Sequence, residues 1–183
     1  MKTFAFAGYS GAGKTTLIEQ VIPRLVAHGL RVSLIKHAHH EVDVDHPGKD
    51  SWRHRQAGCT EVMLVSGSRW ALMHELRGEP EPGFAEQLAR LSPCDLVLVE
   101  GYKQLALPKL ELLPEVEPGT PLRPLLALTD PDIAAVAAPQ PLAAEHRTAL
   151  AEVAAARGVD LPCFDRNDTA AITSFILDVT DLR

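Results

Sequence analysis

A glycine-rich stretch near the amino terminus constrains the fold of this chain more than any other feature. Residues 8–16 read Gly-Tyr-Ser-Gly-Ala-Gly-Lys-Thr-Thr, which matches the phosphate-loop pattern G-x-x-x-x-G-K-[ST]. Gly11 and Gly13 let the backbone turn tightly and aim its N–H groups inward, where they form a nest for an anion. Lys14 supplies a positive charge for the β- and γ-phosphates of a nucleotide, and Thr15 supplies a hydroxyl for Mg²⁺.

The residues on either side of this loop have the pattern that the motif requires. Residues 2–7 are predicted to form a short buried strand, and Leu17, Val21 and Leu25 give an apolar stripe at helical spacing. A strand, a glycine-rich loop and a helix in this order place the phosphates at the positive end of the helix. Pro23 lies inside the predicted helix, so we expect a kink or a short break there.

The rest of the chain alternates between strand-like and helix-like segments. This alternation predicts an α/β, P-loop NTPase-like fold: a doubly wound, mostly parallel sheet with helices on both faces and a β-hairpin excursion. Nucleotide is expected at the carboxyl ends of the strands. The length of 183 residues predicts a single domain over residues 1–183. Predicted strands cover 31–36, 60–65, 69–74, 95–100, 109–113, 124–128 and 159–164, and predicted helices cover 50–57, 84–91, 142–157 and 169–179.

Composition narrows the class of protein. The net charge of −6 disfavours nonspecific nucleic-acid binding, which needs clustered lysine and arginine. No apolar run approaches the roughly 20 residues that span a bilayer, and the phosphate-loop strand begins at once, so we expect a cytoplasmic protein without membrane contact. The three cysteines are widely spaced, and we expect reduced, mostly packed thiols at Cys59, Cys94 and Cys163.

Glu100 is the second candidate for the magnesium site. It ends the most apolar predicted strand, Asp-Leu-Val-Leu-Val-Glu over residues 95–100, and Gly101 follows it. A carboxylate at the tip of a buried strand beside a phosphate loop is expected to hold Mg²⁺ directly or through water. Gly101 would let the backbone approach the γ-phosphate. A solvent-exposed acid at a strand end is the alternative interpretation.

A histidine-rich and aspartate-rich stretch over residues 36–51 carries a second group of polar side chains. Imidazoles in such number suit zinc or nickel. The stretch could instead sense the γ-phosphate, with Asp50 or Ser51 reaching the magnesium shell, or be a solvated surface loop. The histidines are His37, His39, His40 and His46, and the cations that could bind an anionic substrate are Lys36, Lys49, Arg53 and Arg55.

The choice of base is weakly specified. A guanine-reading quartet is usually Asn/Thr-Lys-x-Asp, in which the Asp accepts from two guanine N–H groups. Residues 129–132 read Thr-Asp-Pro-Asp after a predicted strand, so Asp132 is a candidate although Asp130 replaces the lysine. Asp168, after the last predicted strand, is another candidate, but capping the following helix is the stronger expectation for it.

Three segments together resemble the MobB family of molybdopterin-guanine dinucleotide biosynthesis adapter proteins. They are the phosphate loop, the stretch Ile-Lys-His-Ala-His-His-x-x-Asp-Val-Asp-x-Pro-Gly-Lys-Asp-Ser over residues 35–51 with the Arg-Gln-Ala-Gly at 55–58, and Asp-Leu-Val-Leu-Val-Glu-Gly-Tyr-Lys at 95–103. The resemblance runs over roughly residues 1–175, and its middle segment is the most specific to the family.

The resemblance implies a GTP-binding protein with weak Mg²⁺-dependent GTPase activity that forms a homodimer. Its implied partner is the guanylyltransferase that joins GMP to molybdopterin; molybdoenzymes or their chaperones are further partners, and the molybdopterin cofactor is a bound substrate. Lys14 would neutralise charge during slow hydrolysis, and Thr15 would hold magnesium with Glu100. Asp50 is a further magnesium candidate, from its place in the polar stretch and not from the resemblance. The implied phosphate contacts are Ser10, Gly11, Ala12, Gly13, Lys14, Thr15 and Thr16.

Two other functions remain open from the residues themselves. A small-molecule P-loop kinase would need an acceptor site and an arginine-rich lid, and Arg53, Arg55, Arg69 and Arg77 are not clustered in the sequence. A metal-insertion GTPase would use the histidine-rich stretch, and its support is the run of imidazoles over residues 37–46.

Overall fold

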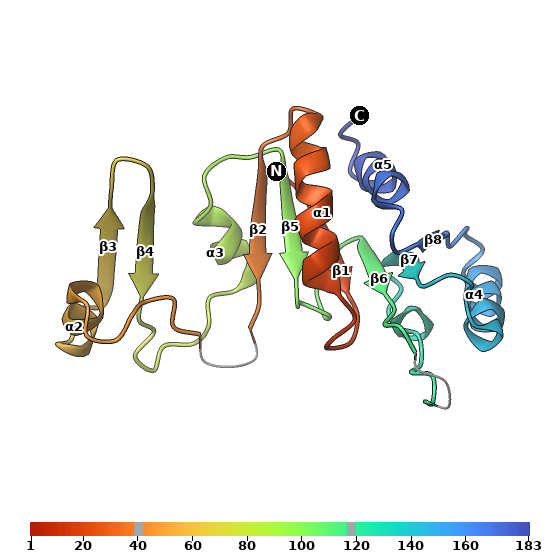
Figure 1. Ribbon diagram of the computed structural model, residues 1–183, viewed down its shortest axis with the longest axis horizontal. Helices are drawn as coiled ribbons and strands as arrows, with labels where there is room; N and C mark the ends of the chain where they lie inside the picture. The colour runs from red at the N-terminus through yellow and green to blue at the C-terminus, as the bar shows by residue number, and fades with distance from the viewer. Residues whose placement is uncertain (39–41, 117–119) are drawn as a thin grey trace. The chain divides into compact units, whose positions relative to one another are not determined.

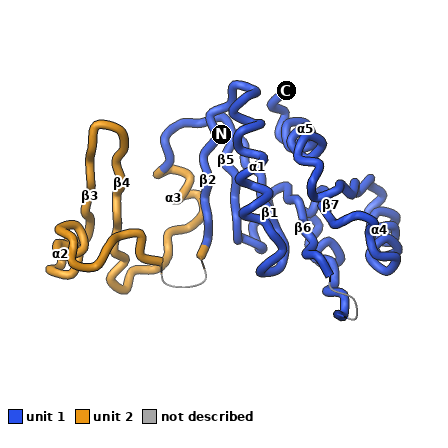
Figure 2. The backbone as a smooth tube through the Cα atoms, viewed as in Figure 1, with its two compact units in different colours: residues 1–37, 91–183 blue, residues 38–90 orange. Residues whose placement is uncertain are grey.

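The structure, a computed structural model, describes residues 1–38, 42–116 and 120–183 (Figure 1). The chain divides into two compact units, the first made of residues 1–37 and 91–183 and the second of residues 38–90 (Figure 2). The behaviour of the whole chain as one folding domain stays a prediction. In the described part of the chain, no helix has the length and apolarity needed to cross a membrane.

The first unit is built on a six-stranded parallel sheet in the order β2-β5-β1-β6-β7-β8. β1 therefore lies inside the sheet, with β5 and β2 on one side of it and β6, β7 and β8 on the other. The loop at the carboxyl end of β1 thus lies where α/β sheets bind ligands. The fold class predicted from the sequence is confirmed. The strands are β1 Lys2–Ala7, β2 Val32–Lys36, β5 Leu96–Glu100, β6 Lys109–Leu112, β7 Ile133–Ala138 and β8 Cys163–Asp165.

Helices cover both faces of this sheet. α1 (Lys14–Ala27) and α5 (Thr169–Val179) pack together over one face (Figure 1), where Phe4 and Phe6 of β1 enter their core cluster. Ala7 points to the other face, because side chains alternate along a strand, and joins the core beneath α4 (Ala144–Arg157). α1 continues to Ala27, so the break expected at Pro23 does not occur.

The second unit contains a β-hairpin between two short helices. β3 (Glu61–Val65) pairs antiparallel with β4 (Trp70–His74), as the sequence predicts, and α2 (Asp50–Gln56) and α3 (Phe84–Ala89) flank the hairpin along the chain. Several apolar side chains of the hairpin remain exposed. They are Met63, Leu64, Val65, Trp70 and Leu72.

One predicted strand is wrong, and one strand was missed. Residues 126–128 form a short 3₁₀ helix, η1 (Leu126–Leu128), because the buried carboxylate of Glu111 accepts hydrogen bonds from the Leu126 and Ala127 N–H groups at 2.7 and 2.9 Å. Those N–H groups are therefore not available to a sheet. The missed strand, β7, reads Ile-Ala-Ala-Val-Ala-Ala, and alanine is depleted in strands, so composition did not indicate it.

Candidate functional site

The glycine-rich loop joins β1 to α1 at the carboxyl edge of the sheet, as the motif predicts. Gly8 has a φ of 141°, and a Cβ built on it would lie 2.5 Å from the carbonyl oxygen of Leu112 on the neighbouring strand β6. Only glycine fits so close to another backbone. Gly13, with a φ of 88°, precedes the first residue of α1. The loop is therefore held close to the sheet and delivers its N–H groups to the start of the helix.

Lys14 lies at the first turn of α1 and folds back over the loop. Its Nζ donates to the carbonyl oxygens of Gly8 and Tyr9, each at 3.0 Å. Burial lowers the pKa of the Lys14 ammonium below its usual value, while the carboxylate of Glu100 opposes that shift. The ammonium is thus tethered to the loop by two neutral carbonyl groups.

The predicted magnesium residues lie together. Thr15 Oγ1 donates to Glu100 Oε1 at 2.8 Å, and Lys36 Nζ lies 3.5 Å from Glu100 Oε2. Glu100 is buried at the end of β5, which pairs with β1 in a register that places it opposite Phe6. A hydroxyl and a carboxylate are hard oxygen donors of the kind that Mg²⁺ prefers, so the two side chains fit such an ion.

Gly101 follows Glu100 and has a packing role that the sequence did not indicate, while its predicted approach to the γ-phosphate stays a prediction. A Cβ on Gly101 would lie 2.6 Å from the carbonyl oxygen of His37, and the rings of His37 and Tyr102 stack with their centroids 4.5 Å apart. The absence of a side chain at Gly101 therefore allows the ends of β2 and β5 to approach each other.

Sequence reasoning missed several cations near the phosphate loop. The Lys103 ammonium lies 5.3 Å from the centroid of the Tyr9 ring, and the Arg123 guanidinium lies 4.8 Å from it. Arg166, just after β8, donates from Nη2 to the carbonyl oxygen of Ala12 at 3.1 Å. The rule that loops after parallel strands form the site could have indicated Arg166, because it directly follows the last strand.

The two candidate base readers occupy different positions. Thr129–Asp132 was expected to follow a strand, but it follows η1 and precedes β7, so Asp132 stands at the amino end of a strand with its Oδ2 3.6 Å from Lys109 Nζ. The interpretation of Asp132 as a guanine reader required a strand directly before residues 129–132, where the structure has η1 instead. Asp168 follows β8 at the carboxyl edge and caps α5, accepting from the Ala171 N–H at 3.0 Å.

Asp50, the third predicted magnesium ligand, is the first residue of α2. It belongs to the second unit, whereas Thr15 and Glu100 belong to the first. Its participation in a magnesium shell therefore stays a prediction.

Carboxylates of its own unit hold Arg55, one of the predicted anion-binding cations. The guanidinium donates to Asp43 at 2.8 Å, to Asp45 at 3.3 Å and to Glu75 at 2.5 Å, and its side chain is buried. Hydrogen bonds from Arg55 hold the pKa of Asp43 below its usual range. Arg55 is therefore engaged by carboxylates within the second unit, and anion binding by it stays a prediction.

The histidine-rich metal site is only partly covered by the structure. His39, His40 and Glu41 lie outside the described residues. Among residues 1–38, 42–116 and 120–183, no group of three or more His, Cys, Asp or Glu side chains is placed to hold a metal ion. Metal binding through His37, His39 and His40 stays a prediction.

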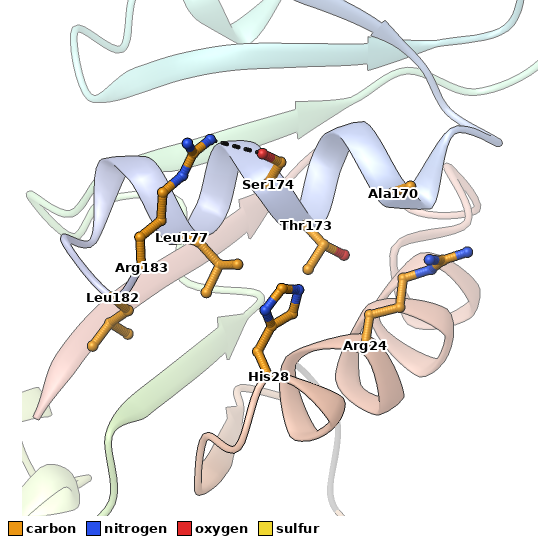
Figure 3. Close-up of a pocket in the computed structure, with 8 residues that line it drawn as sticks. All are labelled: Arg24, His28, Ala170, Thr173, Ser174, Leu177, Leu182 and Arg183. Atoms are coloured by element: carbon orange, nitrogen blue, oxygen red, sulfur yellow. Dashed lines mark hydrogen bonds between the residues drawn. The ribbon is translucent and has the colours of Figure 1, made fainter.

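Three cavities of the first unit bear on the predicted site. One, of about 410 Å³, is lined by Asp132 together with Lys103 and Lys109. Another, of about 480 Å³, lies between α1 and α5, and none of the predicted site residues lines it (Figure 3). Its cations are already engaged, because Arg24 donates to Thr169 Oγ1 and Arg183 to Ser174 and Asp178. A smaller cavity, of about 200 Å³, opens beside Tyr9 and Ser10 of the phosphate loop. The phosphate loop thus borders the smaller cavity.

Comparison with known proteins assigns the family. The family model described as molybdopterin guanine dinucleotide synthesis protein B (MobB) matches residues 3–139. A molybdopterin-guanine dinucleotide biosynthesis adapter protein of Escherichia coli is 38% identical over 176 residues, which cover 95% of this chain and 90% of that protein. A protein of the same name from Haemophilus influenzae is 48% identical over 121 residues, covering 60% of this chain and 66% of that protein.

Solved structures agree on the fold. A MobB homologue from Bacillus stearothermophilus superposes with a TM-score of 0.65 at 24% identity over the full length of both chains. MobB from Bacillus subtilis superposes with a TM-score of 0.69 at 22% identity over 98% of each chain. On the family match and the E. coli relative together, this chain belongs to the MobB family of molybdopterin guanine dinucleotide synthesis proteins.

Proposed function

We propose that this chain is a GTP-binding adapter protein in the synthesis of molybdopterin guanine dinucleotide. The relatives from E. coli and H. influenzae carry the name of such an adapter, and the first of them aligns with nearly the whole chain. The observation that carries the nucleotide part is the contact between Thr15 and Glu100 at 2.8 Å, next to Lys14 on the same helix turn. The family membership and the geometry of the phosphate loop therefore both support the proposal of a GTP-binding adapter.

The chemistry proposed for the site follows from its charges. The N–H groups of residues 10–16 would cradle the β- and γ-phosphates at the positive end of α1, and Lys14 would move from the Gly8 and Tyr9 carbonyl groups to a phosphate oxygen. Thr15 and Glu100 would hold Mg²⁺, which neutralises negative charge between the phosphates when bound. Because Glu100 would then be engaged with the metal, we propose that hydrolysis is slow and that the triphosphate mainly sets the binding state.

We propose Asp168 as the residue that selects guanine, and its position after β8, at the carboxyl edge of the sheet, supports this proposal. Its Oδ1 caps α5, so an Asp168→Ala variant would lose both a cap and a carboxylate. Asp168→Ser keeps a capping oxygen but removes the carboxylate that would accept from guanine. We expect Asp168→Ser to lose the preference for GTP over ATP in a calorimetric titration while its melting temperature stays near that of the unchanged protein. A retained preference would reject Asp168 as the reader.

Dimer formation is assigned to the second unit. Val65 and Trp70 are cross-strand partners in the hairpin, and 73% and 61% of their surfaces are exposed. Apolar side chains grouped on one exposed hairpin are typical of a protein–protein interface. Sedimentation velocity of a Val65→Lys, Trp70→Ser double variant is expected to show a monomer where the unchanged protein shows a homodimer, and an unchanged dimer would place the interface elsewhere.

The adapter role is tested with its proposed partner. The molybdenum cofactor guanylyltransferase is immobilised, and this protein is passed over it with GTP, with GDP and without nucleotide. Complex formation that depends on GTP and disappears in Lys14→Ala supports the proposal. Binding that is unchanged by nucleotide and by the Lys14→Ala substitution would mean that the adapter role does not depend on the phosphate loop. No binding under any condition would reject this partner.

A further inference from the structure

Arg166 is anchored beside the phosphate loop by the sheet itself. Its backbone N–H donates to the carbonyl oxygen of Ala138 at 2.9 Å, which extends the pairing between β7 and β8. From this fixed point its guanidinium crosses to two neighbouring loops. Nη2 donates to the Ala12 carbonyl oxygen at 3.1 Å, and Nη1 donates to the Leu113 carbonyl oxygen at 3.4 Å. One side chain therefore bridges the phosphate loop and the end of β6.

The contact with Ala12 determines how the next peptide group is turned. In a planar trans peptide, the carbonyl oxygen and the following N–H point in opposite directions. Because Arg166 holds the Ala12 oxygen, the Gly13 N–H must point away from the guanidinium, at the start of α1. The Gly13 N–H is one of the groups expected to bind phosphate.

Gly13 makes room for this arrangement. A Cβ built on Gly13 would lie 2.3 Å from Arg166 Nη2, so the guanidinium occupies the space that any other residue at this position would need. The glycine thus serves both the turn of the loop, where φ is 88°, and the approach of Arg166. The two residues are fitted to each other although 153 positions separate them in the sequence.

The charge of Arg166 is not neutralised by its neighbours. Within the described ranges, no carboxylate pairs with Arg166, whereas Arg55 is held by Asp43, Asp45 and Glu75. The known partners of Arg166 are backbone carbonyl groups, which leave its formal charge in place. This charge adds to the positive potential at the loop, where an anion is expected.

We propose that Arg166 is a positioning residue that pre-orients the phosphate loop for a nucleotide and strengthens its attraction for phosphate. The inference rests on the proposed nucleotide function and adds a residue to that site. Losing charge-assisted hydrogen bonds of this kind weakens binding by roughly 10- to 100-fold. Because the loop peptide is involved and the metal is not, the loss should appear for both GTP and GDP, with Mg²⁺ and with EDTA.

The experiment compares three variants by binding of a fluorescent, mant-labelled GTP. Arg166→Met removes the charge and both hydrogen bonds but keeps the length, and Arg166→Lys keeps the charge but loses the two-pronged contact. Arg157→Met is the matched control, because Arg157 also donates to backbone carbonyl groups, those of Asp130 and Ile133, at the amino end of β7. We expect weak binding in Arg166→Met, partial recovery in Arg166→Lys, and unchanged binding with lower thermal stability in Arg157→Met.

A second measurement reports on the conformation of the phosphate loop in the absence of nucleotide. In protein labelled with ¹⁵N-glycine, the Gly13 amide resonance should shift and broaden in Arg166→Met and stay in place in Arg157→Met. Unchanged nucleotide affinity in a folded Arg166→Met protein, or an unchanged Gly13 resonance, overturns the inference. If the unchanged protein binds no nucleotide, the proposed function fails instead, and the Gly13 resonance still decides whether Arg166 orients the loop.

Discussion

Replacing Gly8 by alanine tests the close approach between the phosphate loop and β6. The new Cβ would lie 2.5 Å from the Leu112 carbonyl oxygen, at a φ of 141° that L-residues rarely adopt. Backbone strain of this kind costs about 1–2 kcal/mol. Moving packed neighbours to relieve the contact costs about 1–3 kcal/mol more. We therefore expect Gly8→Ala to lower the free energy of unfolding by about 2–5 kcal/mol.

Gly11→Ala is the matched control in the same loop. Gly11 has a φ of 79°, but a Cβ built on it meets no atom within 4 Å, so only the backbone strain of about 1–2 kcal/mol applies. Both variants exchange glycine for alanine, so the gain from a stiffer unfolded chain cancels in the comparison. The difference of about 1–3 kcal/mol corresponds to roughly 2–12 °C in melting temperature for a domain of this size.

The assay must follow the first unit. Both tryptophans, Trp52 and Trp70, lie in the second unit, so their fluorescence reports on that unit alone. Far-UV circular dichroism follows α1, α4 and α5, the long helices of the first unit. Equal melting temperatures for Gly8→Ala and Gly11→Ala would refute the argument, because the contact with Leu112 would then carry no cost.

Three further outcomes are expected. Glu111→Ala leaves a buried and a half-buried N–H group without an acceptor and should cost about 2–5 kcal/mol in urea unfolding, with a loss below 1 kcal/mol counting against the capping role of Glu111. Because burial lowers the pKa of Lys14, GTP affinity should decline with rising pH before 10.5, and Lys14→Arg should remove that decline. Because the pKa of Asp43 is lowered in the folded protein, its pairing with Arg55 stabilises the second unit fully above pH 3.8, and this stabilisation is lost as the pH falls through the lowered pKa. Acid unfolding of the second unit, followed by tryptophan fluorescence, should therefore depend less steeply on pH in Arg55→Met.

The parts of the site that the sequence predicted depend on local patterns. The phosphate loop combines a fixed spacing of glycines and a lysine with a strand before it and a helix after it, so the motif itself predicts the geometry. Glu100 could be placed because an apolar strand of five residues ends at it and the fold brings such strand ends together. The contact with Thr15 follows from the pairing of β1 with β5.

The parts that were missed depend on contacts between distant residues. η1 is stabilised by the carboxylate of Glu111, which lies 15 positions earlier and is buried, so no local propensity indicates it. Arg166 reaches Ala12 across 154 positions. The role of Arg55 also needed the structure, because a cation near carboxylates in sequence could equally bind a substrate. In each case a tertiary contact, and not the residue type, decides the role.

The most direct test of the account is a calorimetric titration of the folded protein with Mg²⁺-GTP, in parallel with the Lys14→Ala variant. Lys14 is half-buried and contacts only the carbonyl groups of its own loop among its hydrogen-bond partners in the described residues, so the variant should stay folded. The account predicts stoichiometric GTP binding by the unchanged protein and loss of most of that affinity in Lys14→Ala. Equal affinity in the two proteins, or no binding in either, would contradict it.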